Sequence, residues 1–504
     1  MPGFTLTGMN IKLTTLSLFL FFCSTLSGQM LVLPGDHPDP SVVKIGDTYW
    51  ASSTTSNWAP AFPLMFSKDL VHWKQKGYVF NELPAWADYY FWAPEITYDN
   101  GKVYVYYAAH KKGGNLCIGV ASADKPEGPY KDHGPLMCQE VGSIDAFPMR
   151  DENGKLYLIW KEDANSVGRP TSIWAMEMNE ERTALVGEKK ALFRNDVAWE
   201  GNLVEGASII KHGDYFYAFY AGSGCCGLNC SYGVGIARSK RLLGPWEKFA
   251  MNPVIKHSDK NRWTCPGHGT PVEMDGRFYF LYHAYDNKSN VFTGRQGLLT
   301  EFSFTPDGWI RFNGTPAIDP VATNSLDKFS SHKLSDAWQW SVFKKPAYTI
   351  RWGKLKLNGE AGPSGSYVAQ KIMKADYTAT TFVKAKKSSA IPGIAAIGDE
   401  KNMVSAQYTS GSVNVIVLRD GREELLTSGK IGAQKNLWLR LRSQNGKDLF
   451  LSYSINGKDF IALNELPIDG SFLPPWDRAV RVGIISKGSA DQKAAYDGFE
   501  IRYL

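Results

Sequence analysis

A short unit recurs five times between residues 39 and 283. Each copy has a lone polar residue, an apolar stretch and a glycine turn that leads into a strand rich in aromatic residues. The copies read DPSVVKIGDTYW, EITYDNGKVYVYY, DAFPMRDENGKLYLIW, EGASIIKHGDYFYAFY and HGTPVEMDGRFYFLYH. Their turn glycines, at positions 46, 101, 154, 213 and 276, follow one another at nearly even intervals. A regular period of this kind is typical of stacked or radial units that cannot bury their own faces singly.

The repeated unit predicts a blade of a β-propeller. Glycine turns between alternating apolar and aromatic residues indicate β-hairpins, and each interval has room for about four short strands. Four-stranded sheets arranged around an axis form a propeller. Five copies therefore predict a five-bladed β-propeller, which we place at residues 33–318.

The repeat then ends, and a second all-β domain is expected. Residues 315–331 are rich in Pro, Ser, Asn and Asp, as in a linker. Short alternating segments follow from residue 327 to 504, separated by turns such as Asp420-Gly421 and Asn456-Gly457. This pattern predicts a β-sandwich. Whether such a sandwich binds polysaccharide or only supports the propeller stays open at this point.

Composition narrows the classes of function. The net charge is +6 over 504 residues, and no Lys/Arg cluster or basic stripe stands out. Nucleic-acid binding is therefore not expected. Aromatic residues make up 13% of the chain, which fits all-β packing and also stacking on sugar rings.

Residues 1–28 have the pattern of a secretory signal peptide. Lys12 precedes an apolar run, and small residues follow before Gln29, where we expect cleavage. The run is too short to span a bilayer, and no later stretch is long enough. We therefore expect a soluble protein, secreted or periplasmic, without a membrane span.

Six cysteines remain after the signal. They lie at positions 117, 138, 225, 226, 230 and 265. An even number in an exported chain permits disulfides, and six cysteines allow 15 pairings. Cys225 and Cys226 are adjacent and are not expected to bond to each other. The spacing lacks the partner pair and histidines of a zinc site.

The lone polar residue of each repeat is the candidate functional group. Each lies six to nine positions before its turn glycine; the five are Asp39, Glu95, Asp145, Glu205 and His268. If the repeats are related by rotation, these side chains ring one mouth of the central channel. Gathering four carboxylates there costs electrostatic energy that a purely structural protein has little reason to bear.

Each candidate also has a structural interpretation. Asp39 lies between two prolines that would hold its backbone still, but it could be a simple turn residue. Glu95 could contact substrate or be paired structurally. Trp92 could present its face to the channel or belong to the core, His268 could be a hydrogen-bonded structural residue, and Arg295 could lie on the surface.

Carboxylates that meet at one pit predict glycoside hydrolysis. One carboxyl group protonates the leaving oxygen while a second activates water or attacks carbon. A third acid can hold up the pKa of the proton donor. A sugar-binding propeller without catalysis is the alternative from another class, although all three acid positions are filled.

Several ordered motifs resemble glycoside hydrolase family 43. They are Pro38-Asp39-Pro40-Ser41, Trp92-Ala93-Pro94, Ser143-Ile144-Asp145, Val204-Glu205-Gly206, Gly267-His268-Gly269 and Gly294-Arg295. The resemblance covers about residues 33 to 315. The C-terminal part is similar to the concanavalin-like β-sandwich appended to the family's β-xylosidases and arabinofuranosidases.

The resemblance implies an inverting mechanism that needs no cofactor for its chemistry. Asp39 would match the general base, Glu205 the general acid and Asp145 the residue that modulates the pKa. Trp92 would match a substrate-stacking residue and Arg295 a substrate-binding arginine. His268 would match a channel histidine that in some members helps to hold a structural calcium ion, largely through water.

The implied substrates are pentose-containing oligo- and polysaccharides of plant hemicellulose. We expect removal of terminal β-D-xylosyl or α-L-arabinofuranosyl units, with endo-arabinanase activity as the alternative. The Gly-Ser-Gly-Cys-Cys loop at residues 222–226 resembles arabinan-acting members more than the common β-xylosidase pattern. The choice between xylose and arabinose therefore stays open.

Overall fold

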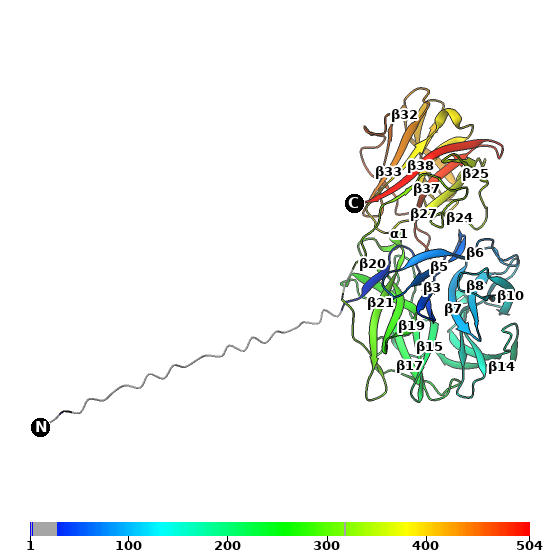
Figure 1. Ribbon diagram of the computed structural model, residues 1–504, viewed down its shortest axis with the longest axis vertical. Coiled ribbons are helices and arrows are strands. Elements are labelled where there is room, and N and C mark those ends of the chain that lie inside the picture. Colours follow the sequence, from blue (N-terminus) through cyan, green and yellow to red (C-terminus); the bar gives the residue numbers. More distant parts are fainter. Residues whose placement is uncertain (2, 4–27, 317–318) are drawn as a thin grey trace.

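The computed structural model describes residues 1, 3, 28–316 and 319–504. The expected signal peptide lies almost wholly outside these described residues. Two β-rich bodies lie one above the other along the long axis (Figure 1). In the described part of the chain, no helix has both the length and the apolar character needed to cross a bilayer.

The lower body is built from five separate antiparallel sheets. The first three are β2 (Ser41–Ile45), β3 (Thr48–Ser52), β5 (Ala61–Ser67) and β6 (Lys74–Phe80); β7 (Trp92–Asp99), β8 (Lys102–His110), β9 (Leu116–Ala123) and β10 (Lys131–Cys138); and β11 (Ser143–Arg150), β12 (Leu156–Glu162), β13 (Ser172–Met178) and β14 (Leu185–Arg194). The fourth is β15 (Val204–His212), β16 (Tyr215–Gly222), β17 (Gly233–Ser239) and β18 (Glu247–Lys248).

The fifth sheet joins the two ends of the propeller sequence. It contains β19 (Trp263–Met274), β20 (Arg277–Asp286), β21 (Arg295–Phe304) and β22 (Ile310–Phe312), and its remaining strand is β1 (Met30–Leu33). Strand β1 pairs with β21, with Met30 opposite Leu299 and Leu31 opposite Leu298. The start of the chain thus closes the ring, because it covers an edge of the last blade that would otherwise present unpaired backbone groups.

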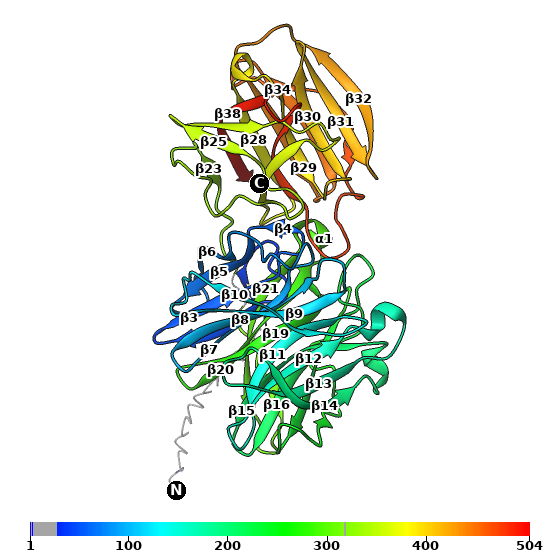
Figure 2. The same ribbon diagram turned by 90° about the vertical axis from the view of Figure 1, so that its right-hand side faces the viewer.

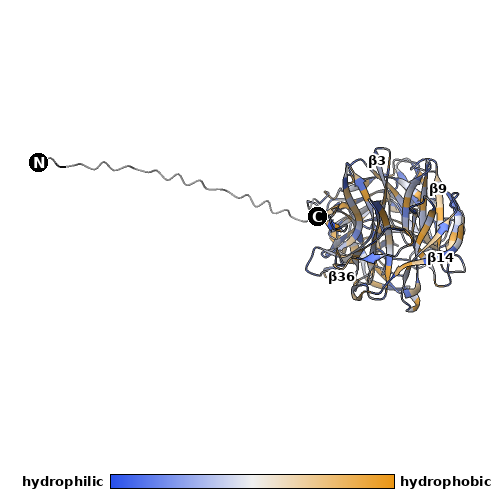
Figure 3. Ribbon diagram, turned by 90° about the horizontal axis from the view of Figure 1, so that it is seen from below, coloured by the Kyte–Doolittle hydropathy of each residue, from blue (hydrophilic) through white to orange (hydrophobic). Residues whose placement is uncertain are grey.

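The first strand of every sheet contacts the first strand of the next. The contacts run β2–β7–β11–β15–β19 and return to β2. Seen from below, strands surround a centre, and hydrophobic and hydrophilic residues are interspersed along them (Figure 3). The five-bladed propeller predicted from the repeat is therefore confirmed. The aromatic strands fill the space between blades; Phe62 of one blade packs on Phe91 and Tyr107 of the next.

The upper body is a β-sandwich, as predicted, of a nine-stranded and a six-stranded sheet (Figure 2). The first contains β23 (Ser325–Asp327), β25 (Tyr348–Arg351), β26 (Lys354–Asn358), β28 (Tyr377–Val383), β33 (Leu437–Gln444), β34 (Asp448–Ser454), β35 (Ile461–Ala462), β36 (Ile468–Asp469) and β38 (Lys493–Tyr503). The second contains β27 (Ser366–Lys371), β29 (Ile391–Ile397), β30 (Met403–Thr409), β31 (Ser412–Arg419), β32 (Arg422–Lys430) and β37 (Arg481–Lys487). Alternate residues of strands such as β33 are buried between the sheets.

The two bodies are joined by backbone pairing and by a buried ion pair. Strand β24 (Trp340–Ser341) pairs with β4 (Trp58–Ala59) of the propeller. The guanidinium of Arg481 in the sandwich lies 3.0 Å from the carboxylate of Asp36 in the propeller, and both residues are buried. The loop between β36 and β37 also reaches the propeller, where the backbone oxygen of Asp477 accepts a hydrogen bond from Arg295.

The described residues contain few helical turns. They are the helix α1 (Asn290–Thr293) and the 3-10 turns η1 (Ala164–Val167), η2 (Ala198–Glu200) and η3 (Ala385–Lys387). Because so little of the described chain is helical, the all-β class predicted from the sequence is confirmed.

The six cysteines of the described chain form the disulfides Cys117–Cys138, Cys230–Cys265 and Cys225–Cys226. The expectation that Cys225 and Cys226 would not bond is wrong. Closing the small ring between neighbours demands an unusual turn of the backbone. Glycines flank the pair on both sides, and Gly227, with φ 79°, adopts a conformation that other residues rarely accept.

Candidate active site

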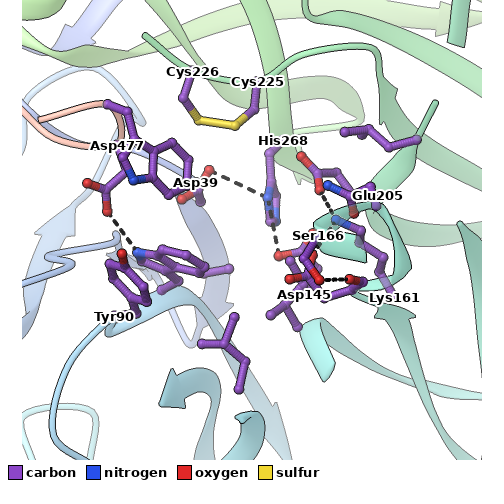
Figure 4. A pocket seen from close by; sticks show the side chains of 18 of the residues that line it. Asp39, Tyr90, Asp145, Lys161, Ser166, Glu205, Cys225, Cys226, His268 and Asp477 are labelled. Carbon is purple, nitrogen blue, oxygen red and sulfur yellow. Dashed lines mark hydrogen bonds and ion pairs between the residues drawn. A yellow bond between two sulfur atoms is a disulfide. The ribbon is translucent and has the colours of Figure 1, made fainter. Parts of the chain in front are cut away.

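One pocket gathers all six site residues named from the sequence. Its volume is about 540 Å³, and it lies where the propeller meets the sandwich. The residues named from the sequence that line it, together with others, are Asp39, Trp92, Asp145, Glu205, His268 and Arg295. Figure 4 shows the three carboxylates and the imidazole pointing into this space from different parts of the ring.

A repeated irregularity of the inner strands aims these side chains. Pairing between the first and second strand of a blade breaks its register beside the polar residue in blades two to five. Residues at or beside these breaks have positive φ: 45° at Ala93, 57° at Asp145, 59° at Gly206 and 35° at His268. Asp39 in blade one has φ 50°. Such bulges turn a side chain out of the sheet, and strain of this kind collects at functional sites.

Glycine is required beside Glu205 because the backbone passes close to a ring. A Cβ atom at Gly206 would lie 2.7 Å from Cγ of His268. The N–H of Gly206 donates a hydrogen bond to Oδ2 of Asp145 at 2.9 Å. The Val204-Glu205-Gly206 motif thus positions two of the three acids at once.

Asp39 is held through both its carboxylate and its backbone. Arg295 donates to Oδ1 at 3.0 Å and Thr54 donates to Oδ2 at 2.7 Å, while the backbone N–H of Asp39 donates to Nδ1 of His283 at 3.0 Å. Burial alone would raise the pKa of Asp39, but Arg295, His268, His283 and Thr54 outweigh it and lower the pKa to about 2. Asp39 is therefore ionised at neutral pH, as a base that accepts a proton from water must be.

Glu205 carries an ion pair that the sequence did not reveal. Lys161 donates to Oε2 at 2.6 Å, and the hydroxyl of Tyr232 donates to Oε1 at 2.7 Å. Burial opposes ionisation of Glu205, but Lys161 and Tyr232 outweigh it and lower its pKa. Burial likewise lowers the pKa of Lys161, and the attraction of Glu205 and Asp163 outweighs it, so that the pKa is raised.

The pKa of Asp145 is shifted in the opposite direction to that of Glu205. Burial first, and then the neighbouring charges of Glu205 and Asp39, raise its pKa to about 6, although His268 and Lys161 act against them. The proton thus resides more readily on Asp145 than on Glu205. Asp145 therefore differs in proton affinity from the other two buried acids of the pocket, and acid–base catalysis uses differences of this kind.

Trp92 forms an aromatic wall with help from the sandwich. Its ring stacks on Tyr90 at 4.4 Å and meets Trp476 edge-on at 5.8 Å. Its indole N–H donates to Oδ2 of Asp477 and to Oγ of Ser56, each at 3.1 Å. Trp476 and Asp477 come from the loop between β36 and β37, so the second domain completes the pocket.

Arg295 lines the pocket and connects the two domains. One amino group contacts Asp39, and the other donates to the backbone oxygen of Asp477 at 3.0 Å. The side chain is buried, with 4% of its surface exposed. Its contacts therefore position the carboxylate of Asp39 and the sandwich loop.

His268 lies between two of the acids. Its Nδ1 is 3.5 Å from Oδ1 of Asp39 and 3.9 Å from Oδ1 of Asp145. Calcium prefers oxygen ligands, and the described residues contain no group of three or more His, Cys, Asp or Glu that could hold a metal ion. The side chains alone thus do not make a calcium cage, and a calcium ion held through water stays a prediction.

Glu95 is the fifth polar residue of the repeat, and it is not among the residues that line the pocket. Thr270 donates to its Oε2 at 3.3 Å. Burial raises the pKa of Glu95 well above its ordinary range. Of the two interpretations left open for this residue, these contacts favour a neutral, structurally paired side chain.

Sequence reasoning missed Lys161, Tyr232 and the residues from the sandwich loop. Lys161 has a signal in the sequence, because it is a charged residue at the end of an aromatic strand, where the other repeats continue with apolar or aromatic residues. Tyr232 has no such signal among the many tyrosines. Asp477 lies far beyond the last repeat, in the second domain, and no spacing relates it to the pocket.

Glycoside hydrolases use a pair of carboxyl groups that flank the scissile bond. The pocket of this propeller holds three buried carboxyl groups, which is enough for that chemistry. Residues 29–310 match the family described as "Glycosyl hydrolases family 43", and residues 326–484 match "Beta xylosidase C-terminal Concanavalin A-like domain". The first match covers more than half of the chain. The protein belongs to glycosyl hydrolases family 43 and is a glycosidase.

Its relatives include named pentosidases. A "Xylan 1,3-beta-xylosidase" of a Vibrio species is 25% identical over 88% of this chain and 92% of its own length. An "Extracellular exo-alpha-(1->5)-L-arabinofuranosidase" of Cellvibrio japonicus is 26% identical over 63% of this chain and 95% of its own length. A crystal structure of a family 43 protein from Bacillus licheniformis is 25% identical, with a TM-score of 0.80 over 94% of this chain and 99% of that one.

Proposed function

We propose that the protein is an exported, inverting glycosidase that removes terminal β-D-xylosyl or α-L-arabinofuranosyl units from hemicellulose oligo- and polysaccharides. The observation that carries the proposal is the meeting of Asp39, Asp145 and Glu205 in one pocket, to whose lining the sandwich also contributes. The names of the Vibrio and Cellvibrio relatives support a pentose as the sugar that is released.

In this mechanism Asp39 is the general base. A water molecule beside its ionised carboxylate loses a proton to Asp39 while the water oxygen attacks the anomeric carbon. The low pKa that Arg295 helps to set keeps Asp39 ready to accept that proton. Attack from the face opposite the leaving group inverts the configuration at the anomeric carbon.

Glu205 is the proposed general acid, which gives its proton to the departing oxygen. Lys161 favours the ionised form of Glu205, so Glu205 must acquire a proton before bond cleavage. Asp145, with a pKa of about 6, holds a proton in the same cluster at mildly acidic pH. We propose that binding of the leaving-group oxygen beside Glu205 weakens the contact with Lys161 and lets the proton reside on Glu205.

Product analysis tests this proposal. The purified protein is expected to release free pentose first from xylo- or arabino-oligosaccharides, and proton NMR of the fresh product should show the inverted anomer. Oligomers as first products would support endo-arabinanase activity instead. Sugar binding without turnover on any pentoside would support the non-catalytic alternative, and a retained anomer would overturn the role given to Asp39.

We also propose export through a signal peptide at residues 1–28. The support is its basic residue, apolar run and small residues before Gln29. N-terminal sequencing of the protein isolated outside the cytoplasm is expected to begin near Gln29. A mature protein that still begins at or near Met1 would contradict export by cleavage.

A further inference from the structure

The bond between Cys225 and Cys226 lies in the wall of the catalytic pocket. Both cysteines line the same pocket as the three acids. Figure 4 shows the sulfur bridge at the edge of the pocket, between Asp477 on one side and His268 with Glu205 on the other. The pair is therefore placed where a bound substrate must pass or rest.

The loop that carries the pair is fastened at both ends. Cys230 bonds to Cys265, which lies three residues before His268 in β19. The N–H of Ser231 donates to the backbone oxygen of Gly224 at 2.8 Å, and the N–H of Gly227 donates to the hydroxyl of Tyr285 at 3.3 Å. These contacts hold a glycine-rich loop in one place without any help from the neighbouring cysteine pair.

A disulfide between neighbours does little for the stability of a fold. Cross-links stabilise mainly by restricting the unfolded chain, and the effect grows with the length of the loop that they close. Cys230–Cys265 closes a separation of 35 residues, whereas Cys225–Cys226 closes a separation of one. The unusual bond therefore needs another explanation, and its position in the pocket gives one.

Chemically, the bridge gives the pocket a rigid apolar surface. A disulfide has no N–H or O–H to donate, and sulfur is large and polarisable. A sugar ring has an apolar C–H face as well as polar edges. The three acids with Lys161 and Arg295 can satisfy the hydroxyl groups, while Trp92 offers one apolar wall. The ring formed by Cys225 and Cys226 is a second apolar wall in the same pocket.

We propose that the Cys225–Cys226 disulfide is a sugar-contacting wall of the pocket and a determinant of substrate specificity. The proposal rests on the pentosidase function proposed above. The pentose bound in the pocket packs a C–H face against the two sulfur atoms. Because the ring is already rigid, little conformational freedom is lost when the sugar binds.

The test compares two double variants that each remove one disulfide. Cys225→Ala/Cys226→Ala removes the wall, and Cys117→Ala/Cys138→Ala removes a bridge between β9 and β10 whose cysteines do not line the pocket. Loss of an apolar contact of about 50 Å² is expected to raise KM about tenfold in the first variant. We expect kcat to stay within about twofold, because such a wall holds ground state and transition state alike.

Specificity and folding are measured on the same proteins. The ratio of kcat/KM for nitrophenyl β-D-xyloside and α-L-arabinofuranoside is expected to change in the first variant and not in the control. Thermal unfolding should show a loss of stability no larger than that of the control. Titration of each protein with free xylose and free arabinose, which have no glycosidic bond to cleave, followed by tryptophan fluorescence, gives a measure of binding that does not depend on turnover.

The outcomes separate this proposal from the proposed function. An active wild type whose KM, substrate ratio and sugar affinity are unchanged in Cys225→Ala/Cys226→Ala would overturn the wall and leave the pentosidase intact. An inactive wild type would overturn the pentosidase, and weaker sugar binding by the variant would still support the wall. Alkylation of Cys225 and Cys226 in the unreduced protein, found by mass spectrometry, would also overturn the proposal.

Discussion

Replacing Glu205 by Gln tests the assignment of the proton donor most directly. The side chain keeps its shape, so the amide oxygen can still accept from Lys161, and the hydroxyl of Tyr232 can turn to accept from the amide N–H. What is lost is the proton that the leaving oxygen must receive. The ammonium group of Lys161 keeps a second carboxylate partner in the variant, Asp163 at 3.1 Å, so we expect the variant to fold.

The size of the effect depends on the leaving group. For a xylo- or arabino-oligosaccharide, Glu205→Gln is expected to lower kcat/KM by about 10²- to 10⁴-fold, which is the usual contribution of a general acid. That corresponds to about 3–5 kcal/mol of transition-state stabilisation. For a dinitrophenyl pentoside, whose leaving group departs as a stable anion, we expect a loss of less than about tenfold, because no proton is needed.

Matched variants make the comparison decisive. Asp39→Asn removes the base that activates water, so it is expected to slow both substrates by a similar factor. Asp145 is the alternative proton donor, because its pKa is raised whereas that of Glu205 is lowered. If Asp145→Asn shows the dependence on leaving group and Glu205→Gln does not, the roles of these two acids must be exchanged. An equal loss on both substrates in Glu205→Gln would refute the reasoning.

Three further predictions concern stability and metal binding. The pKa of Asp145 is raised from its ordinary value to about 6, so the contribution of its protonated form to stability is full below about pH 4 and is lost as the pH rises through 6. Asp145→Asn should therefore raise Tm at pH 7 and leave it nearly unchanged at pH 4. An equal shift of Tm at both pH values would contradict this prediction. Asp36→Ala leaves the buried guanidinium of Arg481 without its carboxylate partner, so it should cost about 3–5 kcal/mol in urea unfolding, and a loss below about 1 kcal/mol would show that the interface does not depend on this pair. EDTA is expected to leave kcat unchanged, whereas a rise in Tm on adding calcium, lost in His268→Ala, would support the predicted channel calcium.

The fold was predictable because the same sequence unit occurs five times in the chain. Glycine turns, aromatic strands and one polar residue per unit recur at a nearly constant interval. In blades two to five the polar residue marks the break in register of the inner strand, and Asp145 and His268 have positive φ there. Rotational symmetry then carries residues distant in sequence to one place, so the positions of Asp39, Asp145 and Glu205 followed from the repeat.

What escaped prediction lies outside that symmetry. Lys161 and Tyr232 surround Glu205 from strand ends and loops whose residues differ between blades. Asp477 comes from another domain, and its approach depends on how the two bodies dock. The bond between Cys225 and Cys226 depends on a backbone turn that adjacent cysteines rarely adopt. Each of these features is set by tertiary contacts of a single blade or loop.

The pairing of β1 with β21 has a consequence for synthesis. Nearly the whole propeller sequence must leave the ribosome before Leu299 can meet Met30, so the last blade cannot be completed while the chain is still short. Until then the edge of β21 that β1 covers has no partner. If the chain is exported unfolded, as proposed above, β1 crosses the membrane first and can pair only after β21 has also crossed.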